Sequence, residues 1–274
     1  MKTCVSTYSF GRYFNQLGLA GTIRKAAEMG FDAIEFVEGD WIRGADAAEV
    51  IRTTCQEVGI TPLALCVGAD YLNNGGEADR VESLIRFAKE MGASMLRHDV
   101  VYSDCGMSFD AIIQQIAPKI RRVAEYGKQM GIHTMTENHG YISQDAYRVK
   151  ALIEAVDHEN FGALIDIGNF LCADEYPPKS VETMLPYVVH VHAKDFFVKS
   201  ASEPNPGSGW FGSRGGNYLR GTIIGHGNAD AAKSLQLIRE SGYDGYVTVE
   251  FEGMEDNLQG IQLGLNNLRR FWQA

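Results

Sequence analysis

The sequence predicts an α/β fold, and more specifically a single (β/α)8 barrel domain spanning residues 1–274. Short β-branched apolar runs alternate with longer segments of helical periodicity, and this happens eight times along the chain. Such alternation indicates a parallel sheet with right-handed crossovers, and eight units close the sheet into a barrel. A doubly wound open sheet would need a glycine-rich phosphate turn after the first strand. The segment SFGRYF (9–14) is not such a turn.

The eight units follow one another in chain order, each with an apolar run and then a helical segment. The predicted strands are Thr3–Tyr8, Ala33–Val37, Thr61–Val67, Ser94–Val101, His133–Asn138, Gly162–Ile167, Val188–Phe196 and Tyr246–Phe251. The predicted helices are Leu19–Met29, Ala47–Val58, Ala78–Met91, Phe109–Met130, Asp145–Val156, Ser180–Tyr187, Ala229–Ser241 and Asp256–Trp272.

A repeated ending supports these helix boundaries. A glycine directly follows the last helical residue at Gly30, Gly59, Gly92, Gly131 and Gly242, and a strand-like run comes soon after each. Glycine accepts the left-handed conformation that ends a helix. The same supersecondary unit therefore recurs along the chain.

One connection is much longer than the others. Residues 198–228, between the seventh strand and its helix, form a glycine-rich insertion that we expect to be a long loop. A long loop over a barrel mouth is commonly a lid. Trp210 would then exclude water, and Arg214 or Arg220 would grip a substrate. A surface loop or an oligomer contact is the alternative.

Composition excludes several classes of protein. The net charge of −10 argues against nucleic-acid binding, which needs many Lys and Arg side chains. No run of 18 apolar residues predicts a membrane span, and the N-terminus lacks the apolar core of a signal peptide. The five cysteines show no CxxC pairing, so we expect reduced, mostly buried thiols and a cytoplasmic location. A homo-oligomer is compatible with the sequence.

Four polar side chains stand where predicted strands end. They are Glu137 in TMTENHG, Asp166 in ALIDIGNF, His192 in VHVHAKDF and Glu250 in VTVEFEG. Catalytic groups of a barrel project from the C-terminal ends of its strands. Taken singly, they could be an ion-pair partner, a turn-forming Asp or a core histidine. Together they predict a divalent metal site, although periodicity alone does not separate His192 from His190, nor Glu250 from Glu252.

These segments resemble the sugar phosphate isomerase/epimerase members of the xylose isomerase-like TIM barrel superfamily. The likeness is carried by GFDAIEF (30–36), LIDIGNF (164–170), HVHAKDF (190–196) and GYDGYVTVEFEG (242–253), and covers nearly the whole chain. It implies that the metal ligands are Glu137, Asp166, His192 and Glu250. The resemblance implies Mn²⁺, Mg²⁺, Co²⁺ or Zn²⁺ as the ion. Three oxygen donors with one nitrogen favour Mn²⁺ or Mg²⁺ over a structural zinc, and we take Mn²⁺ as the first choice.

Further residues are expected around these ligands. The residues predicted to contact substrate are His139, Asn169, Lys194, Trp210, Arg220 and His226. Lys194 either stabilises an enolate oxygen or pairs with a carboxylate, and His226 either reaches the substrate or caps the seventh helix. Glu35 and Arg97 end the second and fourth strands and are expected to lie behind the ligands.

The favoured function is a divalent-metal-dependent isomerase or epimerase acting on a small sugar or keto-sugar. Glu137 and Glu250 are the candidate catalytic pair, one removing a proton beside a carbonyl and the other returning it. A dehydratase of a hydroxy-ketone is the alternative reaction. An abasic-site endonuclease would need a histidine-rich cluster and a basic groove, and a non-catalytic sugar-binding barrel is the remaining class. No phosphate-binding turn is evident, which favours a free sugar.

Overall fold

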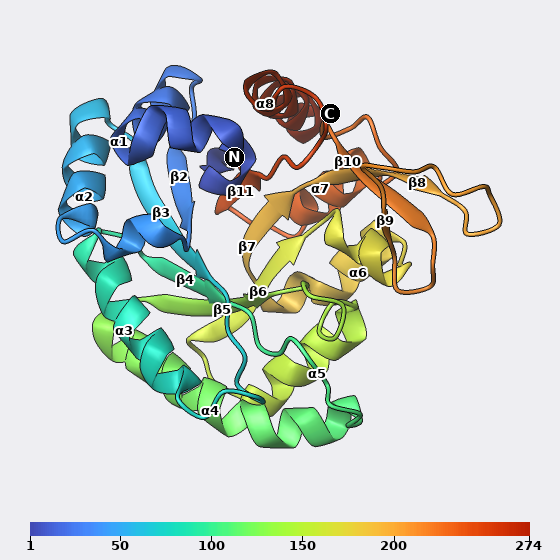
Figure 1. Ribbon diagram of the computed structural model, residues 1–274, viewed down its shortest axis with the longest axis horizontal. Coiled ribbons are helices and arrows are strands. Elements are labelled where there is room, and N and C mark those ends of the chain that lie inside the picture. The colour runs from blue at the N-terminus through green and yellow to red at the C-terminus, as the bar shows by residue number, and fades with distance from the viewer.

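The computed structural model describes all 274 residues and confirms the predicted barrel (Figure 1). The closed sheet has the order β1-β11-β7-β6-β5-β4-β3-β2, and every neighbouring pair of its strands is parallel. Its strands are β1 (Lys2–Ser6), β2 (Ala33–Val37), β3 (Thr61–Val67), β4 (Met95–His98), β5 (His133–Glu137), β6 (Phe161–Asp166), β7 (Val188–Ala193) and β11 (Tyr246–Val249). The strands lie where the sequence predicts them, but β1, β4, β7 and β11 end two or three residues earlier than predicted.

Helices surround the barrel in the expected order (Figure 1). The α-helices are α1 (Arg12–Glu28), α2 (Ala47–Val58), α3 (Glu77–Glu90), α4 (Phe109–Met130), α5 (Ala146–Val156), α6 (Pro177–Met184), α7 (Ala231–Glu240) and α8 (Asn257–Gln273). Short 3-10 helices are η1 (Thr7–Phe10), η2 (Asp40–Arg43), η3 (Asn169–Ala173) and η4 (Leu185–Tyr187). No helix is both long enough and apolar enough to cross a membrane.

The five glycines that follow helices behave as the sequence predicts. Gly30, Gly59, Gly92, Gly131 and Gly242 all have positive φ, between 72° and 88°. Helix α5 ends differently, because Asp157 takes the left-handed conformation with a φ of 46°. These endings turn the chain back toward the N-terminal end of the next strand.

The barrel has two apolar cores, one outside and one inside the ring of strands. The larger core, of 57 buried residues, lies mainly between the strands and the surrounding helices. A small core inside the barrel contains Cys4, Leu63, Met135 and Leu164. Glu35, on β2, is fully buried and follows Ala33 of this inner core along the same strand face. The inner core therefore closes the barrel below a buried polar layer that leads up to the strand ends.

The insertion expected to be a loop instead contains an antiparallel sheet. Strand β10 (Tyr218–Thr222) pairs with β8 (Asp195–Lys199) and with the short β9 (Phe211–Gly212). This sheet projects from one side of the barrel (Figure 1). Phe196, Phe211 and Leu219 form its own small core with Cys172. Packing of these side chains across the paired strands stabilises the segment as a sheet.

Asp195 joins the two ends of this insertion. Its carboxylate accepts backbone hydrogen bonds from Phe196 at the start and from Gly225, Gly227 and Ala229 at the end, at 2.8–2.9 Å. A buried carboxylate with four such donors is well satisfied.

A second set of contacts ties the middle of the insertion to the barrel rim. Asp174, just after η3, accepts hydrogen bonds from Ser213 Oγ at 2.5 Å and from Asn217 Nδ2 at 2.7 Å. Arg214 forms an ion pair with Asp145 at 2.7 Å, and Tyr141 Oη donates to Gly212 O at 2.8 Å. The sheet is thus held at its base and along its length.

Candidate metal centre

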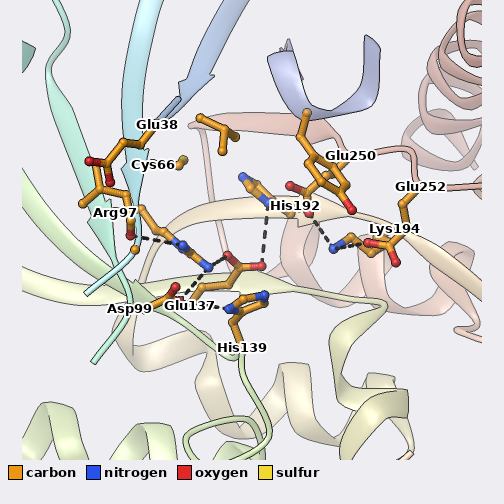
Figure 2. Close-up of a pocket in the computed structure, with 14 residues that line it drawn as sticks. Glu38, Cys66, Arg97, Asp99, Glu137, His139, His192, Lys194, Glu250 and Glu252 are labelled. Carbon is orange, nitrogen blue, oxygen red and sulfur yellow. Dashed lines mark hydrogen bonds and ion pairs between the residues drawn. The ribbon is translucent and has the colours of Figure 1, made fainter. Parts of the chain in front are cut away.

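Four strands deliver the predicted ligands to one point. Glu137 and Asp166 are the last residues of β5 and β6, His192 lies in β7, and Glu250 directly follows β11. One ligand atom from each residue lies within 4.8 Å of the corresponding atoms of the others, and all four residues are buried. Figure 2 shows Glu137, His192 and Glu250 converging on the same space.

Glu35 orients the imidazole of His192. Glu35 Oε1 lies 2.9 Å from His192 Nε2, while His192 Nδ1 faces Glu250 Oε2 at 3.4 Å and Glu137 Oε1 at 4.0 Å. His190 Nε2 and Thr248 Oγ1 also contact Glu35. A carboxylate on the outer nitrogen of a metal-binding histidine is the usual arrangement behind such ligands. His192, and not His190, lies among Glu137, Asp166 and Glu250, while His190 lies behind it against Glu35.

Two buried atoms without a hydrogen bond indicate that these residues fit a cation. Asp166 Oδ2 and His192 Nδ1 form no hydrogen bond, although Lys194 Nζ lies 3.1 Å from Oδ2 and Glu250 Oε2 lies 3.4 Å from Nδ1. The other oxygen of Asp166 accepts backbone bonds from Gly168 and Asn169, as a turn-forming Asp does. Burial raises the pKa of Asp166 to about 7, although Lys194 acts in the opposite direction. A divalent ion coordinated by Oδ2 and Nδ1 would satisfy both atoms and favour the ionised carboxylate.

Glu137 is held on both sides by polar partners. Arg97 Nη2 forms an ion pair with its Oε2 at 2.5 Å, and Asn169 Nδ2 donates to its Oε1 at 2.9 Å. Arg97 also contacts Asp99 at 2.9 Å, and Asp99 contacts His139 Nδ1 at 3.0 Å. The chain of contacts thus runs from a candidate ligand to a half-exposed histidine at the mouth (Figure 2).

Lys194 lies among three carboxylates on the opposite side. Its Nζ is 2.6 Å from Glu250 Oε2, 3.1 Å from Asp166 Oδ2 and 3.2 Å from Glu252 Oε2. Burial opposes ionisation of Glu250, but Lys194 and His192 lower its pKa well below the usual range. Glu250 is therefore an ionised carboxylate beside a protonated amine.

A cavity of about 390 Å³ opens directly above these groups. Its lining consists of Tyr8, Val37, Glu38, Cys66, Val67, Gly68, Arg97, Asp99, Glu137, His139, His192, Lys194, Glu250 and Glu252. Of the residues predicted to contact substrate, His139 and Lys194 line it, and Asn169 lies just behind it on Glu137. The cavity is large enough for a small polar ligand.

The structure places Trp210, Arg220 and His226 outside this lining. The Arg220 guanidinium stacks over the rings of Phe197 and Trp210, at 5.0 and 5.4 Å from their centroids. His226 is exposed in the turn that wraps around Asp195. Their contact with a substrate stays a prediction, and the cavity gives it no support.

Sequence reasoning missed several lining residues. Asp99 directly follows β4 and Glu38 directly follows β2, so both stand at strand ends and had the same signal as the predicted ligands. Tyr8 and Cys66 carry no comparable signal, because an aromatic ring or a thiol near a strand end is commonly part of a core.

Fold and site together define an α/β-barrel protein with a candidate centre for a divalent metal at the C-terminal ends of its strands. The model of the xylose isomerase-like TIM barrel family matches residues 23–271, and the chain belongs to that family. The resemblance inferred from the sequence is thereby confirmed.

Curated relatives in this family include a decarboxylase and dehydratases. The 3-oxo-isoapionate decarboxylase of Pectobacterium atrosepticum is 25% identical over 246 residues, covering 86% of this chain and 80% of the relative. The inosose dehydratase of Lacticaseibacillus casei is 25% identical over 142 residues, covering 51% of this chain and 47% of the relative. The chain thus matches about half the length of the dehydratase.

Solved structures with the same fold include an epimerase and a magnesium complex. D-psicose 3-epimerase from Clostridium cellulolyticum H10 aligns with a TM-score of 0.77 at 15% identity, covering 100% of both chains. A xylose isomerase-like TIM barrel protein from Mycobacterium smegmatis, in complex with magnesium, aligns with a TM-score of 0.76 at 18% identity, covering 99% of this chain and 97% of that one. At these identities the likeness shows the shared fold.

Proposed function

We propose that this protein is a divalent-metal-dependent isomerase or epimerase of a small sugar or keto-sugar. The observation that carries the proposal is the convergence of Glu137, Asp166, His192 and Glu250 within 4.8 Å beneath an open cavity. An ion bound there would supply Lewis-acid stabilisation of the oxygen charge that develops when a carbon beside a carbonyl loses its proton. Mn²⁺ is the first choice, because three of the four donors are carboxylates.

The surrounding residues prepare the two glutamates for proton transfer. Arg97 and Asn169 fix both oxygens of Glu137, so its carboxylate has one orientation. Glu250 keeps its Oε1 free of hydrogen bonds to the protein, while Lys194 holds its Oε2. One glutamate removes the proton from a substrate carbon, and the other returns a proton to the opposite face or to the neighbouring carbon.

Lys194 has a defined role in this scheme. Its buried ammonium lies within 3.2 Å of three carboxylates, and these partners raise its pKa well above the usual value despite burial. It therefore stays protonated and orients Glu250 during the reaction. Its direct contact with a substrate oxygen remains a prediction.

A dehydratase is the second candidate, and the inosose dehydratase among the relatives supports it. Both reactions begin with the same proton removal, and the dehydratase then expels a β-hydroxyl. The decarboxylase among the relatives is a third precedent, in which loss of CO₂ would replace proton removal.

One experiment separates these reactions. The Mn²⁺-loaded protein is incubated in D₂O with a panel of ketoses and keto-inositols and followed by NMR and mass spectrometry. Deuterium incorporation with retention of the molecular formula supports the isomerase or epimerase, and loss of water supports the dehydratase. Glu137→Gln and Glu250→Gln should each abolish product formation while the fold survives. Full turnover in either variant, or in chelator-treated protein, would disprove the proposal.

The partner is accordingly a small-molecule sugar. The five cysteines form no disulfide, and four of them are buried, which supports the proposed cytoplasmic location. A homo-oligomer remains a prediction that size-exclusion chromatography with light scattering would test.

A further inference from the structure

The charged side chains of the cavity wall indicate which charge a substrate can have. The cavity and the side chains paired with its lining contain seven carboxylates, from Glu35, Glu38, Asp99, Glu137, Asp166, Glu250 and Glu252. The same region contains three guanidinium or ammonium groups, from Arg80, Arg97 and Lys194. Adding a divalent ion and a protonated His139 still leaves the carboxylates in excess.

None of these cations is free to bind an anionic ligand. Arg97 is shared by Asp99 and Glu137. Arg80 is shared by Glu38 and Glu77, each at 2.8 Å. Sites for phosphate or carboxylate groups usually offer an arginine fork, a lysine or backbone N–H groups that no protein acid already occupies.

The positive charge of Lys194 stays paired with a carboxylate even when a metal ion binds. If Asp166 and Glu250 serve as metal ligands, Glu252 still lies 3.2 Å from the Lys194 ammonium. Glu252 is therefore placed to neutralise the cation that would otherwise attract an anion. Its side chain is 24% exposed, so it also faces the entrance of the cavity.

Glu38 takes the corresponding position on the other side. It lines the cavity beside Tyr8, and its side chain is 28% exposed and paired with Arg80. Figure 2 shows Glu38 and Glu252 on opposite sides of the space above His192. A ligand entering the cavity thus passes between two carboxylates, neither of which belongs to the candidate metal ligands.

We propose that Glu38 and Glu252 are specificity-determining residues that exclude phosphorylated and carboxylated sugars, so that the site takes an uncharged polyhydroxylated ketone. The inference rests on the proposed function of the same site. Carboxylates accept hydrogen bonds from sugar hydroxyls but repel a phosphate or carboxylate at the same distance. The chain would then differ from a decarboxylase of a sugar acid in the charge of its substrate.

The test compares neutral and anionic forms of one carbon skeleton on the Mn²⁺-loaded protein. Deuterium exchange is measured for a neutral ketohexose and its 6-phosphate, and for a keto-inositol and a cyclic keto-acid of similar size. We expect kcat/KM for each neutral compound to exceed that of its anionic partner by about 100-fold, the size of effect that like charges produce at a partly buried site. In wild-type protein 0.5 M NaCl should narrow this ratio, because salt screens the repulsion.

Variants that remove one carboxylate test whether Glu38 and Glu252 cause the preference for neutral compounds. Glu38→Gln and Glu252→Gln should each shift the ratio by about 10-fold toward the anionic compound, since each removes a carboxylate and leaves a cation less compensated. Glu182→Gln is the matched control, because Glu182 is exposed on α6 and lies outside the cavity. A ratio that is unchanged in both variants, or wild-type protein that prefers the anionic compounds, would overturn the inference.

A binding measurement keeps the inference separate from the proposed reaction. If no compound exchanges deuterium, the proposed function fails, and calorimetry with sorbitol and sorbitol 6-phosphate then tests the charge preference alone. Tighter binding of sorbitol by the Mn²⁺-loaded protein, with a preference reduced in Glu252→Gln, supports the inference. Tighter binding of the phosphate contradicts it.

Discussion

Glu35 Oε1 lies 2.9 Å from His192 Nε2, on the side of the imidazole that faces away from the candidate metal ligands. Both side chains are buried, and Glu35 also contacts His190 and Thr248. The pKa of Glu35 is lowered to about 2 because His192 and His190 outweigh the effect of burial. An ionised carboxylate therefore fixes which nitrogen of His192 faces the cavity.

Replacing this carboxylate should weaken metal binding without removing a ligand. In Glu35→Gln we expect the affinity for Mn²⁺ to fall by about 10- to 100-fold, the usual cost of losing such a partner. Calorimetric titration with Mn²⁺ measures the change, and activity should recover at high Mn²⁺ concentration. Wild-type affinity in the variant would show that Glu35 has only a structural role.

Metal removal should lower stability as well as activity. An ion that binds only the folded chain adds about 2.7 kcal/mol at a concentration 100 times its Kd. The thermal midpoint of chelator-treated protein should therefore rise by several degrees when Mn²⁺ is added. In Asp166→Asn the rise should be mostly lost, because this variant removes the carboxylate whose Oδ2 has no hydrogen bond. An equal rise in both proteins would place the ion elsewhere.

Arg97 should matter for turnover more than for metal binding. Asp99 and Glu137 raise its pKa despite burial, so it is a permanent cation that orients Glu137. Arg97→Lys replaces the planar guanidinium, whose Nη2 contacts both carboxylates, with a compact ammonium on a flexible stem that does not hold Glu137 in the same position. We expect kcat to fall by about 100-fold, as misplacement of a catalytic group often produces, while the Mn²⁺ affinity changes little. Steady-state kinetics and metal titration on the same sample distinguish the two effects.

His98 should make the protein sensitive to acid. Its ring stacks on Phe161 at 5.6 Å and meets the edge of Tyr71, and burial lowers its pKa from 6.5 to about 4. His98 binds a proton more tightly in the unfolded chain than in the folded one. The stability that comes from burying the neutral imidazole is therefore fully present above pH 6.5, and it is lost as the pH falls toward 4. The loss amounts to roughly 3 kcal/mol at full protonation.

Urea unfolding between pH 7 and pH 4 tests this effect. His98→Phe should lose less stability over this range than wild-type protein, whatever its stability at pH 7. A substitution of the exposed His226 by Gln is the control and should retain the wild-type slope. Parallel pH profiles for wild-type protein and His98→Phe would contradict the assignment.

Asp174 should control the order of the inserted sheet. It accepts bonds from Ser213 and Asn217, and Asp174→Asn exchanges one acceptor oxygen for a donor. The free-energy cost should be about 1–3 kcal/mol, confined to the insertion. Limited proteolysis should then cut faster within residues 200–212, while the thermal midpoint of the barrel changes little.

The barrel was predictable because its signals are local and repeated. Each strand is a short apolar run, and glycines with positive φ end five of the helices, so every unit can be recognised alone. The four candidate ligands were predictable for a related reason, since a parallel barrel brings the ends of all its strands to one face.

Other features depend on contacts that no local pattern encodes. The pairing of Phe211 with Leu219 in the insertion is formed across a glycine-rich turn, and its apolar residues are too sparse to predict strands. Arg220 resembled a substrate-binding residue, but its neighbours Phe197 and Trp210 come from other strands or turns of the same sheet. The charge balance of the cavity likewise appears only in the folded chain, where Glu38 and Glu252 lie on opposite sides of it.

Asp195 has a consequence for how this family can diversify. Because one carboxylate accepts hydrogen bonds at both ends of the insertion, it holds the chain just after β7 next to the chain just before α7. Residues between those ends form a cassette, whose length and sequence can change without altering the register of β7 or the start of α7. Replacing this cassette with the corresponding segment of another family member should therefore transfer the function of that segment, while the candidate metal centre stays intact.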